Sequence, residues 1–404
     1  MGVHSLLKYL RDTNPEILEI IELSLLKGYR LAIDVAVVAY AAKSAYISKV
    51  TPKLDLIYMD VDYEDARRYM LVNILKIFLA VLSAGCCPVG IFDGIAPKLK
   101  GGTKKDRQLK SVSKMEKIAR LRHIGSGLLK DPHNFKLTED DIKFLRSFPK
   151  DITTIDGIRE RLKTEINSYI PIDSTDYFLL STVLAALGVP HVFAECEAEK
   201  TCSQMARHKD VIAIYTTDSD CLMYGCPIMI NKLIYMQSAT IPVPPKAQCY
   251  IFSNALAITN LKHTQFIDFC IMCGTDFNKN SPGYGPDKNY ELLTTYGSIP
   301  KMMKAKSELQ EYYKERSLHT KSKNDKLLLE YDFTFLNYDE VRCYITKPIS
   351  YDKNSLKIKV SGVDLNNSLN TIKNILGEKI ATSIMETCKK IFNYLKSVEQ
   401  TMKH

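Results

Sequence analysis

Seven carboxylates stand where an apolar run of the sequence ends or has just ended. They are Asp34, Asp93, Glu197, Glu199, Asp218, Asp220 and Asp276. Like charges gathered in a low-dielectric site repel one another strongly, so a cluster of this size needs cations. Oxygen ligands suit hard divalent cations, and we expect two Mg²⁺ ions, for which Mn²⁺ would substitute. Each carboxylate alone could equally be a helix cap or a surface charge; the set as a whole predicts a metal site.

The spacing of the acidic residues favours phosphodiester chemistry. Glu197-x-Glu199 and Asp218-x-Asp220 each bring two carboxylates to one place from a single turn. Two metal ions roughly 3.5–4 Å apart can activate water, hold a phosphate and stabilise the leaving oxygen. A formal net charge of +9 favours a polyanionic substrate. The sequence contains no P-loop and no dinucleotide-binding glycine fingerprint, and its scattered histidines form no nucleophilic triad by spacing.

The elements that would position these residues alternate between strands and helices. Strands are expected at 30–34, 88–93, 189–193, 211–215 and 228–230, and helices at 2–11, 36–49, 62–84, 174–187 and from about 195. Such alternation predicts an α/β fold, with a mostly parallel sheet covered by helices on both faces. Ligands bind such sheets at the carboxyl ends of the strands, and three such ends carry Asp34, Asp93, Asp218 and Asp220.

Four regions are expected along the chain. They are an N-terminal α/β region at 1–97, a basic helical insert at 98–170, a second α/β region at 171–300 and a C-terminal extension at 301–404. The insert has no strand pattern and is rich in Lys and Arg. Within the extension, 301–330 is typical of a solvated helix or linker, and 331–404 is Lys- and Asn-rich with no role that its composition assigns beyond contact with a duplex.

A second motif follows the last carboxylate. The segment Ser281–Lys288 contains Gly283-x-Gly285-Pro286, a turn that exposes backbone N–H groups and opens a helix at the proline. This geometry can hold a phosphate at a helix N-terminus, although an ordinary turn would look the same. Its place just after Asp276 favours the phosphate site.

Cysteine usage and hydropathy predict an intracellular protein. The 11 cysteines follow no disulfide framework, the chain start is not a signal peptide, and no apolar run reaches the roughly 20 residues of a membrane span. Cys270 and Cys273 form a C-x-x-C without a second pair, so buried core cysteines are favoured over a zinc site.

Six short motifs, in chain order, resemble those of the flap endonuclease/XPG family of structure-specific nucleases. They are Met1-Gly2-Val3, Leu31-Ala32-Ile33-Asp34, Ile91-Phe92-Asp93-Gly94, Cys196-Glu197-Ala198-Glu199, Thr217-Asp218-Ser219-Asp220-Cys221-Leu222, and Gly274-Thr275-Asp276 followed by Gly283-Tyr284-Gly285-Pro286. The resemblance covers most of residues 1–300.

The resemblance implies a PIN-like 5′-nuclease fold with a helical arch and a helix–two-turn–helix near 276–296. It implies that the seven carboxylates bind metal, and that Lys100 and Arg107 are catalytic through contact with the scissile phosphate. Tyr40 would stack on an unpaired base. Residues expected to bind DNA besides Tyr40 are Gly2, Gly283, Gly285 and Lys288, with K⁺ as a further ion at the Gly283–Gly285 turn. The implied partner is branched or nicked DNA, which would be cleaved as a flap or by 5′-3′ exonuclease action.

Departures from the family keep other functions open. The gap from Asp93 to Glu197 is long, Ile95 and Ala96 replace more polar or Pro residues, and no clear sliding-clamp peptide is present. An mRNA-degrading endoribonuclease resembling the herpesvirus virion host shutoff protein is one alternative. A Holliday-junction resolvase of the same family and a non-catalytic binding protein are two others. The nucleus or a cytoplasmic viral replication site would suit the lead function.

Overall fold

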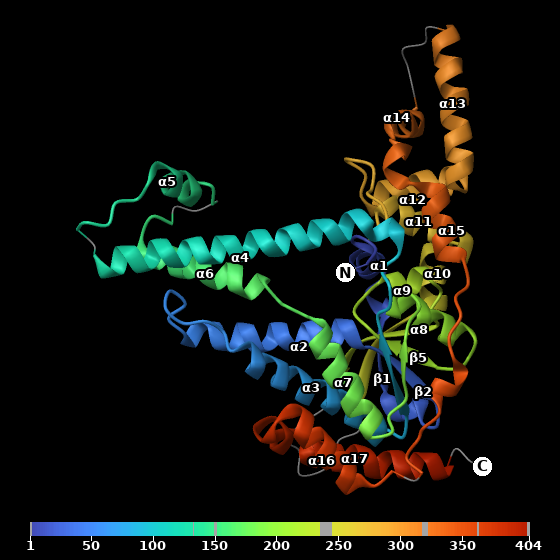
Figure 1. Ribbon diagram of the computed structural model, residues 1–404. Coiled ribbons are helices and arrows are strands. Elements are labelled where there is room, and N and C mark those ends of the chain that lie inside the picture. The colour runs from blue at the N-terminus through green and yellow to red at the C-terminus, as the bar shows by residue number, and fades with distance from the viewer. Residues whose placement is uncertain are drawn as a thin grey trace.

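The computed structural model describes residues 2–131, 133–148, 152–234, 245–316, 322–361 and 363–401. These residues form a seven-stranded sheet in the order β1-β7-β6-β5-β2-β3-β4 (Figure 1). The strands are β1 (Leu18–Glu22), β2 (Arg30–Asp34), β3 (Cys87–Phe92), β4 (His191–Phe193), β5 (Ala213–Tyr215), β6 (Ile228–Ile234) and β7 (Lys246–Ile251). Neighbouring strands among β2 to β6 pair in parallel, and β7 and β1 add an antiparallel edge. The predicted α/β class is confirmed, and β1 and β7 are the strands that the sequence pattern did not predict.

Both faces of the sheet are buried, and β2 shows how. Leu31 and Ile33 enter the core on one face, while Ala32, between them, enters the core on the other. This alternation follows from the two-residue repeat of a strand. Helices α2 (Val35–Val50), α3 (Tyr63–Ser83) and α7 (Ser174–Ala186) cover the first face. On the second face lie α1 (Leu6–Thr13), α8 (Ala198–Arg207), α9 (Asp220–Met223), α10 (Phe252–Thr259), α11 (His263–Cys273), α12 (Pro286–Tyr296) and α15 (Tyr338–Thr346).

A helical arm projects from this body on the side of α2 (Figure 1). It consists of α4 (Gly101–Lys130), α5 (Glu139–Arg146) and α6 (Ile155–Ser168). Leu121 and Ile124 of α4 pack with Ile158 and Leu162 of α6 in a separate small core, to which Ile47 of α2 also belongs. The arm therefore has its own apolar support and does not rely on the sheet.

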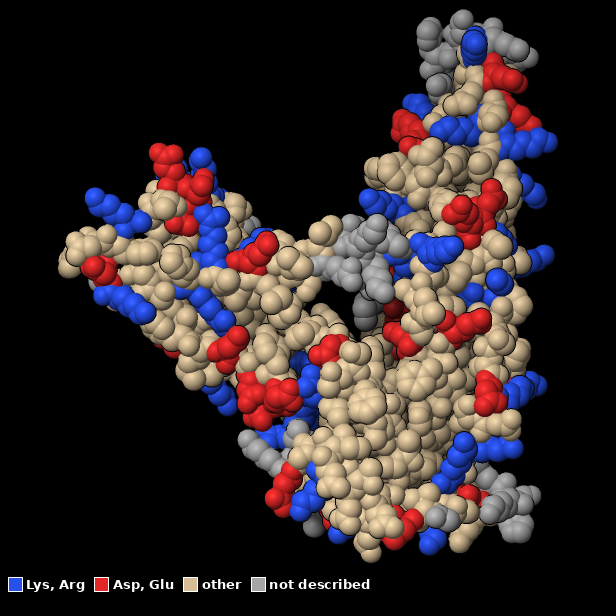
Figure 2. Space-filling model, viewed as in Figure 1, with Lys and Arg blue, Asp and Glu red and all other residues tan. Residues whose placement is uncertain are grey.

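A second projection extends from α12. It consists of α13 (Ile299–Arg316) and α14 (Lys323–Glu330), and it rises beside the arm so that the molecule has two prongs (Figure 1). Figure 2 shows Lys and Arg side chains on both prongs, interspersed with acidic ones. None of the helices in the described ranges combines the length and apolar character needed to cross a bilayer.

The last helices of the chain belong to the core. Helix α17 (Glu378–Thr401) packs along α3, and α16 (Leu365–Leu376) packs against α7. Cys388, Ile391 and Leu395 of α17 have no exposed surface. The Lys- and Asn-rich composition of 331–404 concealed this packing, because the charged residues lie on the outer faces of amphipathic helices.

A buried ion-pair network joins α2, α3 and α7. The Lys43 ammonium donates to Asp176 Oδ2 at 2.6 Å and to the Pro171 carbonyl at 2.9 Å, and Arg67 Nε donates to Asp176 Oδ1 at 2.8 Å. The side chains of Lys43 and Asp176 are 2% and 0% exposed. Asp176 also accepts a hydrogen bond from Asp173 N at the start of α7, so it fixes this helix against its two neighbours.

We expect Asp176→Ala to destabilise the fold by about 3–5 kcal/mol, because it leaves the Lys43 charge buried without its partner. Equilibrium unfolding in urea measures this loss. Asp156→Ala is the matched control, since Asp156 forms an exposed pair with Arg159 and should change the free energy of unfolding little. Equal effects of the two substitutions would contradict the stabilising role of the network.

Candidate active site

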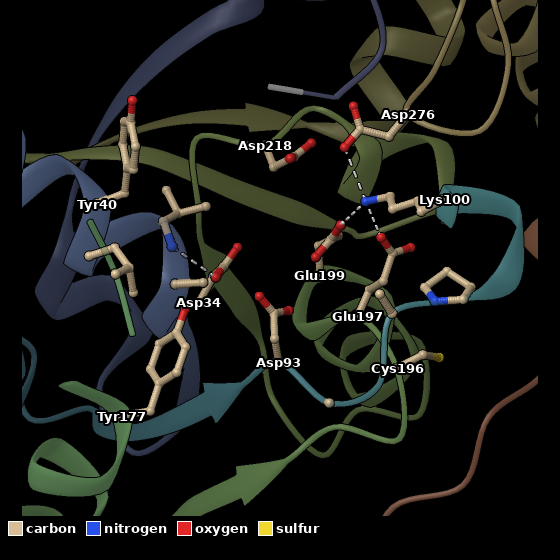
Figure 3. Close-up of a pocket in the computed structure, with 16 residues that line it drawn as sticks. Asp34, Tyr40, Asp93, Lys100, Tyr177, Cys196, Glu197, Glu199, Asp218 and Asp276 are labelled. Atoms are coloured by element: carbon tan, nitrogen blue, oxygen red, sulfur yellow. Dashed lines mark hydrogen bonds and ion pairs between the residues drawn. The ribbon is translucent and has the colours of Figure 1, made fainter. Parts of the chain in front are cut away.

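A pocket of about 370 Å³ opens at the carboxyl ends of β2 and β3 (Figure 3). Six of the seven predicted carboxylates line it: Asp34, Asp93, Glu197, Glu199, Asp218 and Asp276. The seventh, Asp220, is completely buried at the start of α9 and does not line the pocket. Residues that are separated by up to 242 positions in the sequence thus face one cavity because parallel strands end at the same edge of the sheet.

Asp34 is positioned by both the strand that it ends and the helix that it begins. It is the N-cap of α2, and its Oδ1 accepts a hydrogen bond from Val37 N at 3.3 Å. Thr216, after β5, donates its hydroxyl to Asp34 Oδ2 at 2.9 Å. Burial raises the pKa of Asp34 to about 7, and the charge of Asp93 is the second cause of this increase.

The other acidic groups come from turns and helix starts. Asp93 directly follows β3, and its Oδ1 accepts from Ala198 N at 2.9 Å, which fixes it to the first turn of α8. Glu197 is the N-cap of the same helix, and Glu199 lies in its first turn. Burial raises the pKa of Glu199, with the Glu197 charge as the next cause. Helix N-termini favour negative charge, which partly offsets the repulsion.

Lys100 is the cation inside the acidic pocket. It is the N-cap of α4, at the base of the arm, and its ammonium forms ion pairs with Glu197, with Asp276 at 3.1 Å and with Glu199 at 3.9 Å (Figure 3). Burial opposes the charged form of Lys100, but the three carboxylates outweigh it and hold the pKa of the ammonium above its usual value. Among the described residues, no three His, Cys, Asp or Glu side chains are grouped closely enough to bind a metal ion.

The donor set nevertheless fits a hard divalent cation. Both carboxylate oxygens of Asp220 are buried and have no hydrogen-bond partner in the described part of the chain. Burial, followed by the charge of Asp218, raises the pKa of the Asp220 carboxyl well above its usual value. A buried charged group without a partner destabilises the fold. A hard cation beside Asp220 would reduce this free-energy cost by pairing with the carboxylate.

Gly2 packs directly against the paired aspartates. Its φ is +85°, a conformation that disfavours a side chain, and a Cβ built there would lie 2.1 Å from Asp218 Oδ1. His4 N donates to the Gly274 carbonyl at 2.9 Å, which ties the chain start to the end of α11. The chain start therefore approaches the paired aspartates at a position where a side chain would not fit, and the predicted contact of Gly2 with DNA stays a prediction.

Two further predicted residues lie on or near this pocket. Tyr40 of α2 lines its wall and is 44% exposed (Figure 3). Arg107 falls within α4, but its side chain lies outside the described set, so its predicted role stays a prediction.

The predicted glycine turn borders a second, open pocket of about 640 Å³. Gly2, Asp276 and Gly283 line it, so Asp276 faces both pockets. Gly283 has a φ of +82°, and Gly285 is the N-cap of α12, which begins at Pro286 as predicted. Apart from the adjoining residues, no atom in the described part of the chain lies within 4 Å of a Cβ built at Gly283 or Gly285, which leaves this backbone open to a ligand. Lys288 Nζ donates to the Gly283 carbonyl at 2.9 Å.

The sequence pattern does not indicate several residues that lie near the carboxylates. Tyr177 of α7 lines the pocket, and Tyr224 and Tyr344 both donate their hydroxyls to Glu197 Oε2, at 3.1 Å and 2.9 Å. Tyr224 and Thr216 flank the Asp218–Asp220 motif within four residues, so their proximity was a usable signal. Tyr344 lies 147 positions from Glu197, and nothing in the sequence connects the two.

The sheet order, the acidic pocket at its carboxyl edge and the arm above it define a PIN-like 5′-nuclease domain. The family models of the XPG N-terminal domain and the XPG I-region match residues 1–114 and 188–276, together just over half of the chain. The chain therefore belongs to the flap endonuclease/XPG family.

Curated relatives include two proteins named Flap endonuclease 1. The one from Trypanosoma cruzi (strain CL Brener) is 26% identical over 306 residues, which cover 76% of this chain and 68% of the relative. The one from Babesia bovis is 23% identical over 353 residues, which cover 85% of this chain. The match spans 45% of the Babesia bovis protein, less than half of its length.

Solved structures share the fold at low sequence identity. The catalytic core of Rad2 in complex with DNA substrate has a TM-score of 0.60 and 17% identity, over 96% of this chain and all of that chain. Flap endonuclease-1 from Methanococcus jannaschii has a TM-score of 0.52 and 18% identity, over 94% of this chain and 96% of that one. GEN1 with product DNA and Mg²⁺ has a TM-score of 0.53 and 14% identity, over 96% and 79%.

We expect a pH-dependent stability in metal-free buffer that Asp34 helps to set. Its folded-state pKa of about 7 exceeds the ordinary aspartate value of 3.8, so between these pH values the folded chain holds a proton that the unfolded chain has released. Raising the pH through this window should therefore lower the melting temperature.

Thermal unfolding in EDTA from pH 5 to pH 8 measures this dependence, and Asp34→Asn should flatten it. Asp156→Asn, which changes an exposed carboxylate, is the control and should follow the wild-type curve. Parallel curves for Asp34→Asn and the wild type would contradict the raised pKa.

Proposed function

We propose that the protein is a divalent-metal-dependent, structure-specific 5′ nuclease that hydrolyses phosphodiester bonds in branched or nicked DNA. One observation carries the proposal: six carboxylates and the Lys100 ammonium share one pocket, and Asp276 connects this pocket to the open glycine turn. An acidic site that is ready for cations and an exposed backbone that can hold a phosphate together suit a nucleic-acid substrate. Relatives named as flap endonucleases, and a related fold solved with DNA, support this substrate class.

The seven carboxylates would hold the metal, directly or through water. We propose two Mg²⁺ ions, which Mn²⁺ could replace, because the donors are all carboxylate oxygens and Asp220 lacks any other partner among the described residues. When bound, such ions supply an activated water and stabilise negative charge on the phosphate. The protein's own contribution is to hold the carboxylates at fixed places on strand ends and helix starts.

Lys100 would stabilise the charge that develops on the scissile phosphate. Its ammonium already lies among the carboxylates, at the point where α4 leaves the body, and its raised pKa keeps it charged at neutral pH. Arg107, two turns further along α4, is proposed as its partner. A preorganised cation in a water-poor site stabilises a transition state more than the same charge does in water.

The DNA would lie across both pockets. Tyr40 offers an exposed ring for base stacking at the wall of the acidic pocket. Gly283 and Gly285 would contact the backbone of one duplex strand, with K⁺ as an additional ion, and Lys288 would stabilise the turn or reach a phosphate. Gly2 is proposed to allow the chain start to approach the DNA without a side chain in the way.

The arm would receive the unpaired strand. A groove between α4 and α6 is lined by Lys110, Lys114 and Lys117, cations suited to a phosphate backbone. Arg161 also lines this groove, where it forms an ion pair with Glu165. The boundaries 1–97, 98–170, 171–300 and 301–404 remain our proposed division into nuclease, arch, nuclease and C-terminal regions. A DNA substrate fits the nucleus or a cytoplasmic site of viral replication.

The deciding experiment compares cleavage of four end-labelled substrates in Mg²⁺: a 5′-flap DNA, a nicked duplex, a four-way junction and a single-stranded RNA. We expect cutting near the base of the flap, and loss of cutting in Asp220→Asn with binding retained, because phosphate contacts supply most of the affinity. Ca²⁺-supported gel shifts measure the binding.

Other outcomes would change the assignment. Preferred cutting of the four-way junction would indicate a resolvase, and preferred cutting of RNA would indicate an endoribonuclease. Binding without cutting of any substrate would contradict the proposed nuclease. Loss of binding together with cutting in Asp220→Asn would assign Asp220 a role in folding instead.

We expect Lys100→Ala to slow single-turnover cleavage by about 2–4 kcal/mol of barrier, the range for the loss of one charge-stabilising donor. Lys98→Ala is a matched control, because Lys98 lies in the same turn, is exposed and does not line the pocket. An unchanged rate in Lys100→Ala would remove Lys100 from the catalytic machinery.

A further inference from the structure

Glu197 is held from two sides. Its Oε1 faces the pocket, where it forms an ion pair with Lys100, and its Oε2 accepts two hydrogen bonds from the phenols of Tyr224 and Tyr344. Each phenol contact is of normal hydrogen-bond length. The carboxylate therefore has one oxygen directed to the reaction site and one oxygen fixed from behind.

The two phenols come from different parts of the chain. Tyr224 directly follows α9 and lies four residues after Asp220, inside the XPG I-region match. Tyr344 belongs to α15, in the C-terminal extension, outside the residues that either family model matches. The extension thus reaches the acidic site with a polar group.

Tyr344 is itself locked in place. The buried Lys200 of α8 donates its ammonium to the Tyr344 carbonyl, and this ammonium lies 3.9 Å from the centre of the Tyr344 ring. On another side, the Phe277 ring is centred 4.8 Å from that of Tyr344. Lys100 Nζ in turn lies 5.1 Å from the centre of the Phe277 ring, so Tyr344 and Lys100 contact the same aromatic ring and the same carboxylate.

Helix α15 has a separate anchor, formed by Arg342 and Tyr338, which lie two and six residues before Tyr344. Arg342 forms an ion pair with Asp268 of α11, and Tyr338 donates to the same carboxylate at 3.3 Å. Asp268 is buried and also accepts from Ile299 N. This anchor fixes the position of α15 without touching Glu197, so the hydroxyl of Tyr344 can be removed without releasing the helix.

We propose that Tyr344 is a positioning residue that orients Glu197 for metal binding, and that the C-terminal extension thereby completes the active site. Without these donors, the Glu197 carboxylate could rotate about its side-chain bonds and lose its orientation toward the other carboxylates. Two donors on Oε2 restrict that rotation. Groups of this kind, which orient a ligand from behind, commonly matter about 10- to 100-fold for metal affinity or activity.

The phenols act as donors because they stay protonated. Burial raises the pKa of Tyr224 and of Tyr344 above the ordinary phenol value, and the charge of Glu197 is the second cause. Neither hydroxyl should ionise at neutral pH, so both can donate to the carboxylate throughout the working range.

The test compares Tyr344→Phe with Tyr351→Phe. Both substitutions remove a phenol hydroxyl from a carboxylate, but Tyr351 contacts Asp210 and lies away from the pocket. Mn²⁺ titration followed by electron paramagnetic resonance measures metal affinity without any need for activity. We expect Tyr344→Phe to weaken Mn²⁺ binding by about 10-fold or more, and Tyr351→Phe to leave it unchanged. Equal Mn²⁺ affinity for Tyr344→Phe and the wild type would overturn the proposal.

Tyr224→Phe and the double variant add a second criterion. Because both hydroxyls donate to one oxygen, their effects on Mn²⁺ affinity should be coupled and not additive. In a Glu197→Gln background, Tyr344→Phe should have no further effect on Mn²⁺ affinity. An undiminished effect in that background would show that Tyr344 acts through packing alone, and would also overturn the proposal.

The inference rests on the proposed function, and the two can fail separately. If wild-type protein binds Mn²⁺ but cuts none of the four substrates, the proposed nuclease function is contradicted. The effect of Tyr344→Phe on Mn²⁺ affinity can still be measured in that case. If wild-type protein cuts the flap and Tyr344→Phe equals it in Mn²⁺ affinity and in single-turnover rate, only the positioning role of Tyr344 is contradicted.

Discussion

Electrostatic repulsion among buried carboxylates is the constraint on which the rest of this structure depends. Six acidic side chains share one cavity and a seventh lies behind it, and burial raises the pKa of several of them. A fold can tolerate such a cluster only if its carboxylates are held by elements that do not move apart. Strand ends, helix caps and hydrogen bonds from Thr216, Ala198 and two phenols meet that need. The electrostatic repulsion that remains among these carboxylates then favours the binding of cations.

Lys100 connects the acidic site to the arm. It is the last residue before α4, so the ammonium that neutralises part of the cluster is also the point at which a 30-residue helix leaves the body. The side chain that enters the pocket and the first turn of the arm are therefore joined at one backbone position. A phosphate that attracts the ammonium would act on the base of the arm at the same time.

The sequence predicts elements that a local pattern determines, and it does not predict contacts between residues that are far apart in the chain. Arg30–Asp34 was predicted as a strand with its observed bounds, since an apolar run that ends in an acid at a helix cap leaves few alternatives. The sequence pattern does not reveal β1 and β7, because this antiparallel edge carries polar residues such as Glu19 and Gln248. The arrival of Tyr344 at Glu197 depends on the path of the whole C-terminal extension, and no local pattern encodes that path.

The packing of α17 along α3 has a consequence for how the chain folds. These helices are far apart in the sequence, and the part of α3 that α17 covers stays exposed until α17 has been synthesised. Contacts of such high sequence separation form late and slowly. Premature termination of translation would therefore leave an apolar stripe exposed on an otherwise formed domain, a surface that favours aggregation and recognition by chaperones. The core on this face of the sheet is complete only when α17 has docked against α3.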